Sequence, residues 1–117
     1  MCSSLVSDIY SSSAAVSVAT ALLVSTFTAT AGDVAAGRQK AIHCQACHGL
    51  DGLSKLPTAP HLAGQNETHL IKALKDYRSG ARKNEMMSIV ASSLTDADIN
   101  DLAAYYHSIK TIDKPPE

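Results

Sequence analysis

Cys44-Gln45-Ala46-Cys47-His48 is the stretch of the sequence that decides the fold. It follows the pattern C-x-x-C-H, in which two thiols separated by two residues are followed directly by an imidazole. This pattern is the attachment signature of c-type haem. The spacing lets both sulfurs reach the two vinyl groups on one edge of a porphyrin, and the histidine then lies under the iron as an axial ligand. We therefore expect one haem c, attached through Cys44 and Cys47, with His48 on the iron.

Three other uses of paired cysteines compete with haem attachment. A thioredoxin-like dithiol needs a preceding strand and a βαβ setting, whereas the flanks here are rich in Ala and Lys and have helical character. A zinc site normally has four ligands in two pairs, and the sequence has no second cysteine pair. A disulfide between Cys44 and Cys47 would close a very small loop and stabilise little. The five-residue match favours haem.

The first third of the chain differs in composition from the rest. Residues 1–31 carry one charged side chain, Asp8, and an apolar stretch over 14–24 that is too short to span a bilayer. They end in Ala-Thr-Ala, a small-x-small site of the kind that signal peptidase cuts. We expect residues 1–31 to be a signal peptide cleaved after Ala31, with the protein secreted across the inner membrane into the periplasm.

The signal is atypical in one respect. No Lys or Arg precedes Arg38, although the start of a secretory signal is usually positive. An uncleaved membrane anchor and a wrongly chosen start codon therefore remain alternatives. Export and the C-x-x-C-H motif support each other, because c-type haem is attached outside the cytoplasm.

The composition of residues 32–117 limits the possible functions. This segment has ten Lys or Arg residues and, once Asp8 is set aside, ten Asp or Glu residues. The balance gives no support to a nucleic-acid-binding surface. Only three aromatic side chains remain, all of them tyrosines, and a domain this small usually needs a staple, a metal or a cofactor. A haem in the core would supply the missing apolar bulk.

Helical patterns account for the segments around the motif. We expect a first helix over 34–43, a Gly- and Pro-rich loop over 49–65, and a second helix that Asn66 caps and Gly80 ends. A polar connector is expected over 78–85.

Two further helices complete the predicted fold. Apolar residues over 87–94 predict a short amphipathic helix. Thr95 and Asp98 form a capping-box pattern at the start of a last helix. The sequence shows no strand alternation, so we expect an all-α haem domain over 32–112 of four to five short helices, followed by a flexible tail over 113–117.

These features resemble a known family. Residues 33–110 are similar to a class I cytochrome c domain, most of all to the small bacterial monohaem cytochromes and to single halves of the bacterial dihaem cytochromes c. The markers are Gly37 before the haem motif, His-Gly-Leu-Asp-Gly at 48–52, Pro-His-Leu-Ala-Gly-Gln at 60–65, the Met pair at 86–87, and the segment from Leu94 to Tyr106. A single haem motif is present, so the chain does not resemble a complete dihaem protein.

The resemblance implies roles for further residues. A low-spin haem needs a sixth ligand, and residues 32–117 offer Met86 and Met87. The family spacing implies Met87, with Met86 as the alternative and an ordinary core methionine as a third possibility. The resemblance also implies that the carbonyl of Pro60 holds the second ring nitrogen of His48, and that Gly37 gives clearance beneath Tyr105.

Other polar residues have less specific interpretations. Asn84 is a weak candidate to hydrogen-bond near the Met sulfur or a haem propionate. Four further histidines are expected to be solvated surface residues: His43, His61, His69 and His107. A basic cluster is interpreted either as a solvated face or as a docking patch for an acidic partner: Lys72, Lys75, Arg78, Arg82 and Lys83.

An electron carrier is the function that these features favour, because two strong axial ligands leave no open position for a substrate. Its expected partners are redox proteins, a donor and an acceptor that the sequence does not identify, and a monomer is the expected state. Two alternatives stay open: a cytochrome c subunit of a multi-subunit oxidoreductase, and an open-site haem enzyme or gas sensor.

Overall fold

The computed structural model describes residues 30–111, and this segment is helical without a strand. Its elements are α1 (Val34–Lys40), the 3₁₀ helix η1 (Ala41–His43), α2 (Gln45–His48), α3 (Glu67–Ser79), α4 (Glu85–Ser92) and α5 (Asp96–Ser108). The all-α prediction is confirmed. The expected tail, and the expected signal peptide up to residue 29, lie outside the described residues.

Side-chain caps define where the helices begin. The Asn66 side chain accepts a hydrogen bond from the His69 backbone N–H and starts α3. Thr95 and Asp98 form the reciprocal hydrogen bonds of a capping box at the start of α5. Each cap satisfies N–H groups that have no partner within their own helix. Both predicted starts are confirmed.

The connector between α3 and α4 is shorter than the sequence predicts. It was expected over 78–85, but Arg78 and Ser79 complete α3, and Glu85 already belongs to α4. Gly80 ends α3 with a φ of 80°, in the left-handed region that glycine adopts without strain. The side chain of Asn84 starts α4 two residues earlier than the apolar pattern indicated.

Helices α1 and α5 cross at close range, and a glycine permits it. A Cβ placed on Gly37 would lie 2.0 Å from the Asp101 carbonyl oxygen and 2.7 Å from the Tyr105 Cβ. The clearance that the family resemblance implied for Gly37 is therefore present. At the same crossing, the Lys40 ammonium contacts the carboxylates of Asp98, at 2.8 Å, and Asp101.

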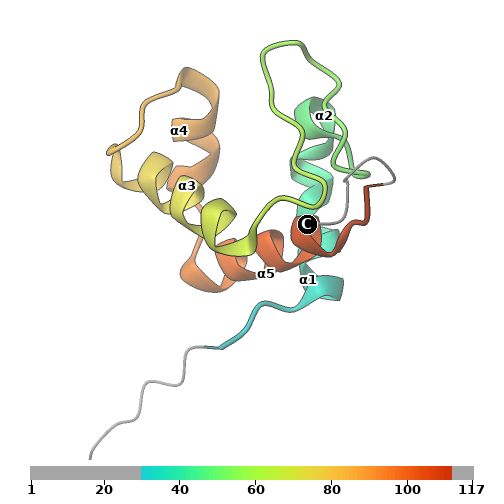
Figure 1. Ribbon diagram of the computed structural model, residues 1–117. Coiled ribbons are helices and arrows are strands. Elements are labelled where there is room, and N and C mark those ends of the chain that lie inside the picture. The colour runs from blue at the N-terminus through green and yellow to red at the C-terminus, as the bar shows by residue number, and fades with distance from the viewer. Residues whose placement is uncertain (1–29, 112–117) are drawn as a thin grey trace, which may run out of the picture.

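The helices form two walls above a common base. Figure 1 shows α3 and α4 on one side, α2 and its following loop on the other, and α5 running beneath both. The buried core lies along α5, where Ile99, Leu102 and Tyr106 are almost fully buried. Within residues 30–111, no helix is long and apolar enough to cross a bilayer.

Candidate functional site

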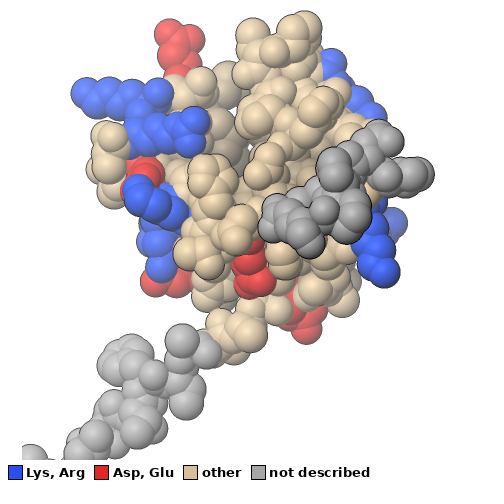
Figure 2. Space-filling model, viewed as in Figure 1, with Lys and Arg blue, Asp and Glu red and all other residues tan. Residues whose placement is uncertain are grey.

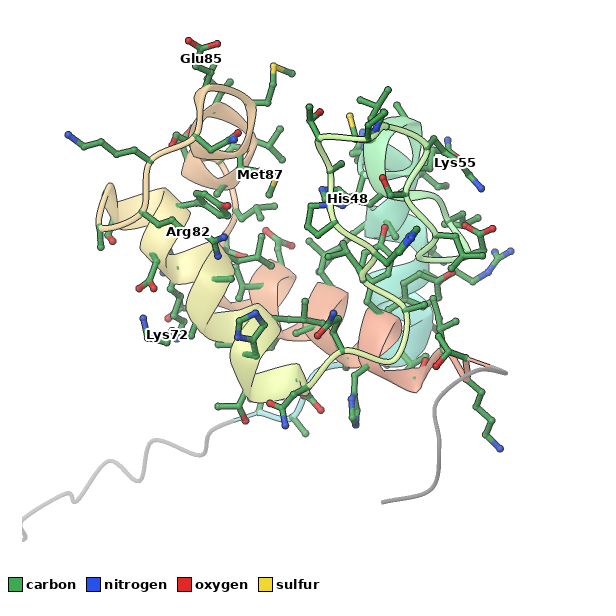
Figure 3. All side chains as sticks on the ribbon, turned by 45° about the horizontal axis from the view of Figure 1, so that its top comes forward. His48, Lys55, Lys72, Arg82, Glu85 and Met87 are labelled. Atoms are coloured by element: carbon green, nitrogen blue, oxygen red, sulfur yellow. The ribbon has the colours of Figure 1, made fainter. Side chains whose placement is uncertain are left out.

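The space between the two walls is an apolar cleft. It holds about 1180 Å³ not filled by atoms, part of it open to solvent. Its lining includes the candidate attachment points and iron ligands from the sequence, and the residue expected to orient His48: Cys44, Cys47, His48, Met86, Met87 and Pro60. Figure 3 shows His48 and Met87 on opposite sides of this space, His48 from α2 and Met87 from α4. The fold thus brings together residues up to 43 positions apart in the sequence.

His48 is the buried polar side chain of the site, with 7% of its surface exposed. Its Nδ1 lies 2.9 Å from the carbonyl oxygen of Pro60. Because a carbonyl only accepts, the proton of the neutral ring lies on Nδ1, and Nε2 keeps its lone pair. The imidazole is therefore oriented and has the nitrogen that a metal ligand needs.

The loop after α2 places Pro60 beside the imidazole. The carbonyl of Gly52 accepts hydrogen bonds from the N–H groups of Leu62 and Ala63, at 2.8 and 3.1 Å. The Lys55 N–H donates to the carbonyl of Cys47, at 2.8 Å, which fastens the loop back onto α2. A segment without regular helix is thus held by backbone hydrogen bonds close to the motif.

The two motif cysteines are half-buried and carry free thiols. Burial raises the pKa of the Cys44 thiol above its usual range, while a hydrogen bond with Tyr106 acts in the opposite direction. In the haem-free chain Cys44 is therefore a protonated thiol at neutral pH. A thiol is the group that adds to a vinyl side chain to form a thioether.

The two methionines differ in their surroundings although both line the cleft. Met86 is 63% exposed, whereas Met87 is half-buried. The Asn84 side-chain oxygen accepts hydrogen bonds from the N–H groups of Met86 and Met87, at 3.1 and 2.9 Å. These two hydrogen bonds make Asn84 the N-cap of α4, a role that the sequence interpretation missed. Its position just before an apolar periodic segment was the available signal.

Two tyrosines of α5 hold the backbone directly after the haem motif. The Tyr105 hydroxyl donates to the carbonyl of Leu50 at 2.7 Å, and the Tyr106 hydroxyl donates to the carbonyl of Gly49 at 3.3 Å. Burial raises the pKa of Tyr106, so its hydroxyl stays a donor. Sequence reasoning assigned these residues to packing alone and missed their hold on the segment that carries His48.

The remaining histidines are exposed, and three of them also line the cleft: His43, His61 and His69. His61 accepts a hydrogen bond from the Ser54 N–H through its Nδ1, at 2.7 Å. His107 lies apart from the cleft, and its Nδ1 contacts the Gln65 carbonyl at 2.8 Å. Their exposure agrees with the surface positions expected of them.

The basic cluster is partly neutralised by neighbouring carboxylates. Lys72 pairs with Asp76, and Arg78 pairs with Asp96 while donating to the Leu94 carbonyl at 2.9 Å. Figure 2 shows basic side chains on the α3 and α4 side of the molecule, with acidic side chains interspersed among them. Of the five cluster members, Arg82 alone lines the cleft.

The donor set of the cleft fits a haem. Two thiols with the C-x-x-C spacing lie beside an imidazole with a free nitrogen, and a thioether lies on the facing wall. The walls between them are apolar, with Leu70, Leu74 and Val90 among the lining residues. This combination suits a flat apolar ring with covalent attachment and two axial ligands.

Comparison with known proteins agrees with this chemistry. Residues 34–110 match the family model described as cytochrome c. The chain belongs to the cytochrome c family. Its resemblance to class I c-type cytochromes is thereby confirmed, and membership supports haem c bound through cysteines, for which Cys44 and Cys47 have the required spacing.

Two relatives and a solved structure give the extent of the similarity. The chain is 48% identical over 80 residues to cytochrome c4 of Pseudomonas aeruginosa, covering 68% of this chain and 40% of that protein. It is 48% identical over 81 residues to cytochrome c-554(548) of Halomonas halodenitrificans, covering 67% of this chain and 98% of the relative. The crystal structure of reduced cytochrome c4 from Pseudomonas stutzeri superposes with a TM-score of 0.64 at 43% identity, over 68% of this chain and 47% of that one. The chain thus spans less than half the length of these two cytochrome c4 proteins.

Proposed function

We propose that this protein transfers single electrons in the periplasm through one haem c, which Cys44 and Cys47 hold and which His48 and Met87 ligate. The observation that carries the proposal is an imidazole and a thioether on opposite walls of one apolar cleft, beside the two motif thiols. When bound, the haem supplies an iron that changes between the ferrous and ferric states.

The chain's own residues favour a carrier over an enzyme or a gas sensor. His48 offers Nε2 from a ring that the Pro60 carbonyl orients, and Met87 offers its sulfur from the facing wall. With His48 and Met87 both bound to its iron, the haem would have no position left for a substrate or a gas. A thioether ligand also favours the ferrous state, which raises the reduction potential.

Met87 is preferred to Met86 as the sixth ligand on two grounds. The spacing found in the family that the sequence resembles assigns this role to Met87. The half-buried position of Met87, against the 63% exposure of Met86, points the same way. A ligand that is withdrawn from water is held more firmly than one at the rim of the cleft.

Location and partners belong to the same proposal. The expected signal over 1–31 directs the protein to the periplasm, where redox proteins would serve as its donor and acceptor. The near-complete coverage of cytochrome c-554(548) supports a single-haem carrier made of one domain. N-terminal sequencing of the mature protein should begin at Gly32, and a start at Met1 in the membrane fraction would contradict soluble export.

A pair of adjacent substitutions tests the ligand and therefore the functional class. The oxidised protein should show the weak red absorption band of methionine sulfur on ferric haem. Met87→Ala should abolish this band, lower the potential and let the reduced protein bind carbon monoxide. Met86→Ala, the matched control, should leave all three properties unchanged. If the wild type already bound carbon monoxide readily, the carrier proposal would fail.

The mass of the intact protein tests the attachment. It should equal the mass of residues 32–117 plus one haem, and it should survive acid and reducing agent. Cys44→Ser combined with Cys47→Ser should remove the haem. A haem-free product with two free thiols, made by a host that matures c-type cytochromes, would refute the proposal.

A further inference from the structure

The loop between α2 and α3 presents the Pro60 carbonyl to His48, and little packing holds it in place. Figure 1 shows its first half projecting from its wall at the end away from α5. Between residues 53 and 61, every residue is exposed except Ser54 and Ala59, which are half-buried. With so few buried contacts, hydrogen bonds decide where this segment lies.

One hydrogen bond closes the loop directly beside Pro60. The backbone N–H of Ser54 donates to Nδ1 of His61 at 2.7 Å, across seven residues. Because Nδ1 accepts this hydrogen bond, the proton of the neutral His61 ring lies on Nε2. His48 carries its proton on the other nitrogen, since its Nδ1 donates to the Pro60 carbonyl.

The donor end of this hydrogen bond is fastened to the haem motif. The Ser54 hydroxyl donates to the carbonyl of Cys47 at 3.3 Å, and the N–H of Lys55 donates to the same carbonyl at 2.8 Å. Cys47 directly precedes His48 in the chain. The acceptor end is His61, the residue directly after the proline. The hydrogen bond therefore ties the proline to the segment that carries the axial imidazole.

We propose that His61 is a positioning residue that sets how strongly His48 donates electron density to the haem iron. The inference rests on the proposed function, because it takes His48 to be an axial ligand. By accepting the Ser54 N–H, His61 fixes the backbone to which the Pro60 carbonyl belongs. That carbonyl in turn holds the Nδ1–H of His48, with 2.9 Å between nitrogen and oxygen.

The hydrogen bond on Nδ1 affects the iron through the imidazole ring. A firmly held Nδ1 proton makes the ring a more basic ligand, and a more basic ligand stabilises the ferric state more than the ferrous state. Without the hydrogen bond between Ser54 and His61, the proline carbonyl would be free to move away from the ring. His48 would then be a weaker donor, and the redox equilibrium would shift toward the reduced protein.

Two further variants separate this role from the mere presence of an imidazole. His61→Asn keeps the acceptor, because the side-chain oxygen of asparagine is bonded to Cγ just as Nδ1 of histidine is. His69 is the matched control, since it is exposed and lines the same cleft but lies on α3. Its backbone N–H donates to the Asn66 cap, and His69→Ala leaves that contact in place.

The test compares His61→Ala, His61→Asn and His69→Ala in the haem-loaded protein at about pH 8, where an ordinary imidazole is neutral. Hydrogen exchange of the Ser54 amide is measured by NMR, together with the chemical shift of the His48 Nδ1 proton in the reduced protein. The redox equilibrium with a reference dye is the third measurement.

His61→Ala should speed exchange of the Ser54 amide by about fivefold, the factor that corresponds to one intramolecular hydrogen bond. It should also move the His48 proton signal upfield and shift the redox equilibrium toward the reduced protein by up to about fivefold. His61→Asn should return all three measurements to the wild-type values, and His69→Ala should leave them unchanged.

Two results would overturn the inference. In the first, His61→Ala speeds exchange at Ser54 but leaves the His48 signal and the redox equilibrium unchanged, so that His61 closes the loop without positioning the ligand. In the second, His61→Asn behaves as His61→Ala does, so that the acceptor is not what matters. Either result leaves the proposed carrier standing, whereas a wild type without covalent haem by mass spectrometry would refute the carrier and the inference together. Helix content by circular dichroism checks that each variant is folded.

Discussion

The close crossing of α1 and α5 predicts that a single added methyl group destabilises the protein. In Gly37→Ala the new Cβ would lie 2.0 Å from the carbonyl oxygen and 2.6 Å from the carbonyl carbon of Asp101. Favourable contacts between such atoms need about 3.5 Å or more. The two atoms nearest to the new carbon belong to helix backbone, which cannot rotate aside as a side chain would. The two helices must therefore separate by more than about 1 Å.

The net cost follows from two opposing effects. Overpacking of a well-packed site costs about 1–3 kcal/mol, and a clash with backbone places this site at the upper end, at about 3 kcal/mol. Alanine in place of glycine within a helix stabilises the folded state by about 1 kcal/mol. Gly37→Ala should therefore lower the free energy of unfolding by about 2 kcal/mol. For a domain of this size, that corresponds to a fall in Tm of about 8–16 °C.

Urea denaturation of the haem-loaded protein, followed by helix circular dichroism, measures the effect. The midpoint should fall at an unchanged slope, because the same surface is exposed on unfolding. Ala35→Gly on the exposed side of α1 is the matched control, and it should cost about 1 kcal/mol or less through helix propensity alone. If Gly37→Ala were as stable as the wild type, the α1–α5 crossing would not limit the packing, and the reasoning would be wrong.

Two further predictions concern an ion-pair cluster and a helix cap. Lys40 hydrogen-bonds the carboxylates of Asp98 and Asp101 and thereby lowers the pKa of each. Because the folded pKa values lie below the unfolded ones, this stabilisation is present above about pH 4 and is lost as the pH falls further. The urea midpoint of the wild type should therefore drop in acid, and the midpoint of Asp101→Asn should drop by less. Asn84→Ala removes the cap of α4 at a cost of about 1 kcal/mol. The red band attributed to Met87 should then be lost at a lower temperature than in the wild type, and an unchanged temperature would contradict a role of the cap in holding the ligand.

The local elements of this fold could be predicted because their causes are local. A cap such as Asn66 or Thr95 acts on N–H groups within three residues, so sequence spacing contains all the information needed. The C-x-x-C-H motif is local in the same way, since attachment and axial ligation require neighbouring residues. The connector between α3 and α4 was predicted to end too late because Asn84 was considered as a partner of the site and overlooked as a cap.

The sequence by itself determined most of the helices, the C-x-x-C-H motif and the two candidate methionines, because each depends on residue type and short-range spacing. Tertiary structure alone decided which distant groups meet. Tyr105 and Tyr106 reach carbonyls 55 and 57 residues away, and no periodicity encodes such a hydrogen bond. It likewise decided that Arg82 faces the cleft while Lys83 does not. Two adjacent cations are equivalent in a charge pattern, and only the turn after α3 and the ring of Tyr77 distinguish them.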